Sequence, residues 1–153
     1  MATLNFREIA KAWLPVLLWM GLMFFGSTDL MSSEHTSQFL TPFLRWLRPD
    51  ISAPTLAQAQ VLIRKAAHVT EYAILAGLIF RALRGLIGTF WLRAVLAFAA
   101  AMTFAVTDEF HQAFVPSRTS SLGDIFIDCA GAIAGIAICR AIHQALPHRH
   151  SAG

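Results

Sequence analysis

The chain has 153 residues, enough for one ordinary domain or a few membrane spans. Hydrophobic residues make up 56% of it and charged residues 14%, whereas soluble domains average about 25% charged residues. This composition argues against a soluble enzyme or a disordered tail, and a net charge of +3 without a dense basic tract argues against nucleic-acid binding. We therefore expect an integral membrane protein with a single domain over residues 1–153.

The first predicted membrane span covers residues 9–27. A transmembrane helix needs about 20 mainly apolar residues, and this stretch supplies them. Arg7 and Lys11 lie at its start, as basic residues precede the apolar core of a signal peptide. Because no small-x-small cleavage site follows closely, we expect an uncleaved anchor.

The longest polar segment, residues 29–64, follows the first span. Its middle combines aromatic and aliphatic residues with Arg45 and Arg48, a mixture that suits a short helix lying in the lipid headgroup region. A loop packed on the bundle is the alternative. Pro54 is expected to start a helix that leads into the second span.

Three more spans are predicted at about 66–83, 87–107 and 123–142, which gives an all-α bundle of four transmembrane helices. The short loop between the second and third spans is rich in arginine, because Arg81, Arg84 and Arg93 flank it. Positive charge in short loops marks the cytoplasmic side. We therefore expect both termini in the cytoplasm.

This topology places polar residues of three spans at one level near the outer membrane face. Ionisable groups inside spans are costly and mark a functional or paired site. The residues expected to form the site are Lys65, His68, Glu71, Tyr72, Asp108, Glu109, Gln112, Arg118, Asp124 and Asp128. Helical spacing puts Lys65, His68 and Tyr72 on one stripe, with Glu71 on its flank. Gly131 and Gly135 continue the stripe of Asp124 and Asp128 and would let another helix approach closely.

Two interpretations of this set remain open. In the functional one, His68, Glu71, Asp108 and Glu109 are candidate acid–base groups, and Arg118 with Arg64 or Lys65 holds a phosphate. The remaining candidates, expected to contact the ligand, are Lys65, Tyr72, Gln112, Arg118, Asp124 and Asp128.

In the structural interpretation, the same residues form a satisfied polar network that joins three helices, with Lys65 or Arg118 paired to Glu109 or Asp128. A metal site is a third alternative, with ligands from His68, Glu71, Glu109 and Asp128. No standard metal motif supports it, and neither a metal nor a cofactor is expected.

Two stretches resemble the VanZ-like family of small bacterial membrane proteins. Residues 64–72 match the family pattern R-K-x-x-H-x-x-E-Y, and residues 108–118 match D-E-x-H-Q-x-F-x-P-x-R, followed by Asp124, Asp128 and Gly131. The resemblance covers roughly residues 10–142. One departure is Ser117, which stands where the family often has glycine.

The resemblance implies a multi-pass protein of the bacterial cytoplasmic membrane that acts near cell-wall precursors or lipid headgroups, because the family's named member is linked to teicoplanin resistance. We expect an outward-facing site that binds, or acts on, an envelope lipid or a lipid-linked precursor; a lipid-tailed glycopeptide is a further expected partner. The alternatives are a non-enzymatic protein that shields a lipid or antibiotic tail, and a small proton-coupled carrier. Four spans without a repeat argue against a carrier that acts as a monomer, although a homo-oligomer could supply the missing half.

Overall fold

The computed structural model describes residues 5–27, 33–114 and 122–145, and these residues are helical apart from short connections. The helices are α1 (Phe6–Gly26), α2 (Ser33–Leu47), α3 (Ala53–Ala82), α4 (Phe90–Gln112) and α5 (Leu122–Ala145), and a short 3-10 helix (Leu83–Gly85) extends α3. Four of them, α1, α3, α4 and α5, are long and apolar enough to cross a membrane. The predicted all-α fold with four membrane spans is confirmed, and the protein is a multi-pass membrane protein.

The helix that contains the second span begins at Ala53, ahead of the span predicted at about 66–83. The Ser52 hydroxyl caps its first turn by accepting a hydrogen bond from the Thr55 amide, and Pro54 lies in that turn, as the sequence predicts. With 30 residues, α3 is about 45 Å long, whereas the hydrocarbon core of a bilayer is about 30 Å thick. Its N-terminal part is therefore longer than the membrane requires.

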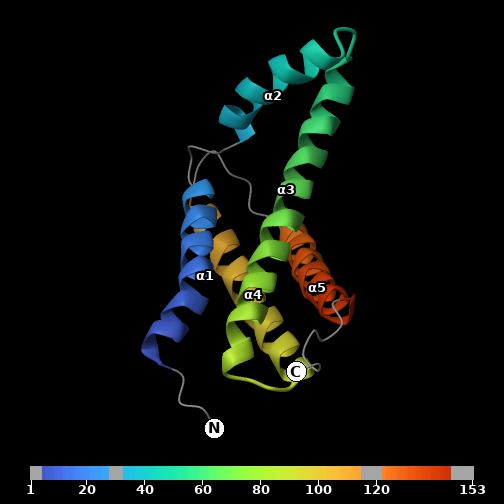
Figure 1. Ribbon diagram of the computed structural model, residues 1–153. Helices are drawn as coiled ribbons and strands as arrows, with labels where there is room; N and C mark the ends of the chain where they lie inside the picture. Colours follow the sequence, from blue (N-terminus) through green and yellow to red (C-terminus); the bar gives the residue numbers. More distant parts are fainter. Residues whose placement is uncertain (1–4, 28–32, 115–121, 146–153) are drawn as a thin grey trace.

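The segment after the first span forms the predicted short helix, α2. This helix meets the N-terminal end of α3 and diverges from it toward the rest of the bundle (Figure 1). The Gln60 side-chain amide donates a hydrogen bond of 2.9 Å to the Thr41 hydroxyl. The opposite face of α2 exposes Phe39, Phe43 and Trp46. Exposed aromatic residues beside arginines are typical of helices in the headgroup region, and that location stays a prediction.

Helix α3 is the centre of the bundle and packs against α1, α4 and α5 (Figure 1). Its large buried side chains, among them Leu75, Ile79 and Phe80, meet small ones on α4, where alanines recur at every fourth position and are fully buried. The buried alanines are Ala97, Ala101 and Ala105. Small residues at a membrane helix interface let the backbones come close.

The closest packing joins α3 to α5. A side-chain carbon at Gly131 would collide with the carbonyl of Val69, and one at Gly135 would collide with the carbonyl of Ala73. The prediction that these two glycines admit another helix is therefore confirmed. The first residues of α1 and the last residues of α5 lie at the same end of the bundle (Figure 1), as expected for four antiparallel spans.

Candidate functional site

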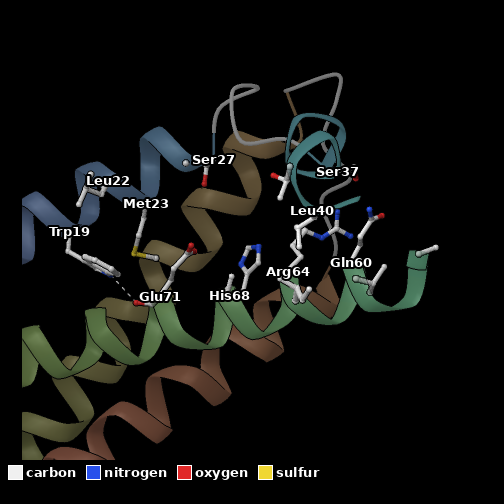
Figure 2. A pocket seen from close by; sticks show the side chains of 16 residues that line it. Trp19, Leu22, Met23, Ser27, Ser37, Leu40, Gln60, Arg64, His68 and Glu71 are labelled. Carbon is white, nitrogen blue, oxygen red and sulfur yellow. Dashed lines mark hydrogen bonds between the residues drawn. The ribbon is translucent and has the colours of Figure 1, made fainter. Parts of the chain in front are cut away.

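A cavity of about 510 Å³ lies between the C-terminal half of α1, the first half of α2 and the N-terminal half of α3. Pockets of roughly 300–1,000 Å³ are the usual size for small-molecule ligands. Figure 2 shows the side chains that surround it. They are Trp19, Leu22, Met23, Gly26, Ser27, Thr36, Ser37, Leu40, Ala57, Gln60, Val61, Ile63, Arg64, Ala67, His68 and Glu71.

The cavity has one polar wall and one apolar wall. On α3, Gln60, Arg64, His68 and Glu71 follow one another at spacings of four, four and three residues, so they form a stripe along one helix face. Opposite this stripe, α1 contributes mainly apolar side chains (Figure 2), namely Trp19, Leu22 and Met23. The cavity is therefore amphipathic and suits a ligand with a polar and an apolar part.

His68 connects the cavity to the interior of the bundle. Its Nδ1 atom lies 3.2 Å from Oδ1 of Asp128 on α5. The Asp128 side chain is only 1% exposed and that of His68 is 14% exposed, so the pair is screened from water on the Asp128 side. A buried carboxylate held against one ring nitrogen fixes the orientation of the imidazole.

Behind this pair lies Tyr72, and four carboxylates belong to the same part of the bundle, namely Glu71 on α3, Asp108 and Glu109 on α4 and Asp128 on α5. The Tyr72 side chain is 1% exposed and packs beside the ring of Phe104, with 6.4 Å between ring centroids. Three helices therefore contribute to one buried polar cluster, as the sequence predicts.

Gln112 joins this cluster to α1. Its side-chain amide donates a 2.9 Å hydrogen bond to Oδ2 of Asp108 and a longer one, 3.4 Å, to the Ser27 hydroxyl. All three residues are buried. Within the described part of the chain, Oδ1 of Asp108 and the Tyr72 hydroxyl have no hydrogen-bond partner although both are buried. Such groups are costly to bury and mark a polar site rather than a packed core.

The site residues predicted from sequence fall into those that line the cavity, those buried behind it and those that do neither. His68 and Glu71 line the cavity, and Tyr72, Asp108, Glu109, Gln112 and Asp128 lie buried behind it. Asp124 is half-buried and acts electrostatically on His68 and Asp128. Lys65 is exposed and does not line the cavity, so Arg64 is the cationic residue that the cavity presents. Arg118 lies outside the described residues.

No group of three histidine, cysteine or carboxylate side chains arranged to hold a metal ion is found among the described residues. The neighbour of the His68 ring in the structure is Asp128. The polar-network interpretation, which paired Lys65 or Arg118 with Glu109 or Asp128, did not anticipate the contact between His68 and Asp128.

The sequence interpretation missed the part that α1 plays in the site. The indole of Trp19 donates a 3.0 Å hydrogen bond to the backbone carbonyl of Glu71 (Figure 2), and Ser27 reaches Gln112. Trp19, Met23 and Ser27 are spaced by four residues and therefore share one face of α1. That spacing, with a polar group at each end, is the signal that would have assigned α1 to the site.

A family model described as VanZ/LLP1 matches residues 12–143, most of the chain, including every residue that lines the cavity or the buried cluster. No curated protein and no solved structure gives a significant match to the chain.

Proposed function

The chain belongs to the VanZ/LLP1 family, and we propose that it binds an envelope lipid or a lipid-linked precursor in the cavity between α1, α2 and α3. The single observation that carries the proposal is the amphipathic lining of this cavity, with Arg64 and His68 on one wall and Trp19, Leu22 and Met23 on the other. A lipid combines a charged headgroup with apolar chains and matches both walls.

Arg64 is the residue best suited to hold the headgroup. Its guanidinium is always charged and forms paired hydrogen bonds with phosphate oxygens. Ser37 and Gln60, which line the same end of the cavity, offer neutral hydrogen-bonding groups beside it (Figure 2). A phosphate at this position would leave the chains of the lipid directed along α1, toward Met23 and Trp19.

The length of α3 supports a place for the cavity in the outer part of the bilayer. His68 is 14 residues, or about 21 Å, from the inner end of α3 at Ala82. The hydrocarbon core of a bilayer is about 30 Å thick, so a distance of about 21 Å from the inner end of α3 is consistent with His68 within the membrane and Arg64 nearer to its surface. With the predicted orientation, that surface is the outer face of the bacterial cytoplasmic membrane, where envelope precursors are consumed.

The proposal is tested by the lipid that co-purifies with the protein. The purified full chain is compared with Arg64→Gln and with the control Arg81→Gln, which removes an exposed arginine at the other end of the same helix. We expect mass spectrometry to find a phosphate-bearing lipid on the wild type and on Arg81→Gln, and several-fold less on Arg64→Gln. Equal amounts on all three proteins would contradict the proposal, and a lipid-tailed glycopeptide that displaces this lipid would identify a second ligand.

A further inference from the structure

We propose that the protein hydrolyses a phosphate monoester of the lipid it binds, with His68 as the proton acceptor and Asp128 as the residue that positions it. This inference rests on the proposed function, because it takes the lipid phosphate to be held at Arg64. Three features of the structure carry it: the contact between His68 and Asp128, the close packing of α5 on α3 beside this contact, and the position of Arg64 in the same cavity.

The contact with Asp128 sets the chemistry of the His68 ring. We take Asp128 as ionised, and a carboxylate in that state only accepts hydrogen bonds, so the Nδ1 atom that faces it then carries the proton. The lone pair is then on Nε2, the ring nitrogen left for a ligand, and His68 lines the cavity with its ring directed into it (Figure 2). A carboxylate that orients a histidine in this manner makes the histidine a general base.

The helix interface below the pair holds it in place. Gly131 follows Asp128 by three residues and Gly135 by seven, and both bring the backbone of α5 into direct contact with α3. A general base must be held within hydrogen-bonding distance of the proton it accepts. A close backbone contact between two membrane helices provides such fixed positions.

Arg64 places the phosphate next to this base. It precedes His68 by four residues, and both residues line the same cavity, so a phosphate bound to the guanidinium lies about one helix turn from the imidazole. The guanidinium also stabilises the negative charge that increases on the phosphate oxygens during the reaction.

The reaction needs water and no further co-reactant. A water oxygen forms a bond to phosphorus while His68 takes one of its protons on Nε2. The bond between phosphorus and the lipid oxygen breaks on the opposite side of phosphorus, where a second water molecule protonates that oxygen, and the hydroxide that remains takes the proton from His68. The products are a lipid alcohol and inorganic phosphate, and His68 returns to its neutral form.

The test uses the full chain in nanodiscs with two probes, phosphatidate and a polyprenyl phosphate, and measures the release of inorganic phosphate together with lipid binding. Wild type is compared with His68→Gln, with Asp128→Asn and with the control His143→Gln, which removes an exposed imidazole at the end of α5. General acid–base catalysis contributes about 10²–10⁴-fold to a rate. We expect His68→Gln to lower kcat about 100-fold or more with binding within a few-fold of wild type.

The Asp128→Asn variant separates positioning from a structural role. We expect it to lower kcat, leave KM nearly unchanged and alter the pH profile of the rate, because the amide no longer selects the same ring tautomer. Its thermal unfolding, measured alongside, shows whether the helices still pack. If His68→Gln fails to fold, the kcat and KM values of Asp128→Asn show whether the pair of His68 and Asp128 serves catalysis. A residue with only a structural role would leave kcat of the folded fraction unchanged.

The outcomes distinguish this inference from the proposed function. A wild type that binds either probe and releases no phosphate overturns the inference and leaves lipid binding intact. A wild type that binds neither probe contradicts the proposed function as well. Phosphate release by folded His68→Gln at the wild-type rate also overturns the inference.

Discussion

The Nδ1 atom of His68 on α3 lies 3.2 Å from Oδ1 of Asp128 on α5, with one side of the ring facing a cavity and the other facing a buried carboxylate. The distance depends on how closely the two helices approach. Gly131 and Gly135 permit this approach because neither has a side chain that would meet the backbone of α3. The site and the closest helix packing of the protein therefore share one interface.

The first prediction concerns Gly135. Changing Gly135→Leu should destabilise the protein by about 1–3 kcal/mol or more, because the new side chain collides with the backbone carbonyl of Ala73, which has no flexible end to move aside. Thermal unfolding in detergent measures the change. Gly21→Leu is the matched control, since a side-chain carbon there meets nothing within 4 Å. Equal unfolding temperatures for the two variants would show that the α3–α5 contact is looser than described.

The second prediction fills the cavity. Gly26 lines it, and a side-chain carbon at this position meets nothing within 4 Å, so Gly26→Leu should fold normally while occupying space that a lipid needs. We expect co-purifying lipid to fall several-fold relative to Gly21→Leu, which adds the same side chain to the same helix outside the cavity. Lipid mass spectrometry provides the measurement, and unchanged occupancy would mean that the ligand binds elsewhere.

The third prediction concerns the buried hydrogen bond of Gln112. Changing Gln112→Leu removes the donor to Asp108 and leaves a carboxylate oxygen buried without its partner. The expected loss of stability is about 1–3 kcal/mol. Gln58→Leu, at an exposed position of α3, should have little effect on the unfolding temperature. If both variants unfold alike, the hydrogen bond contributes nothing to stability.

The four spans and the small helix between the first two could be predicted from sequence, because apolar length and a cluster of aromatic residues with arginines are local signals. The ends of the helices that contain these spans are less clear from sequence. Hydropathy falls at the first charged residue, near residue 107, whereas helix α4 continues to Gln112. It continues because Asp108, Glu109 and Gln112 are buried against other helices and do not need water.

The residues that belong to the site could be predicted in outline, because helical spacing shows which polar residues share one face of a helix. The pairs that these residues form with residues on other helices could not be predicted, because they depend on how each helix is rotated about its own axis. That rotation turns Arg64 and His68 toward the cavity, leaves Lys65 exposed and brings Asp128 to His68. The roles of these residues, and that of Arg118, stay predictions.

A fourth prediction tests the orientation that the outer-face proposal requires. In a background where Cys129 and Cys139 are changed to serine, single cysteines are placed at Asp50 and Gly85, which are exposed at opposite ends of α3. A membrane-impermeant thiol reagent added to intact cells should label Asp50→Cys and leave Gly85→Cys unlabelled until the membrane is opened. The reverse pattern would place the cavity on the cytoplasmic side.

The most direct test of lipid binding in the cavity is a cross-linking measurement with a phospholipid that carries a photoreactive group in its acyl chain. Met23 is 6% exposed and lines the cavity, so lipid on the outer surface of the bundle has little access to it. Adducts on Met23 and Trp19 that disappear in Gly26→Leu are the predicted result. Adducts confined to Leu14, Leu17 and Leu18, which are exposed on α1 and do not line the cavity, would contradict it.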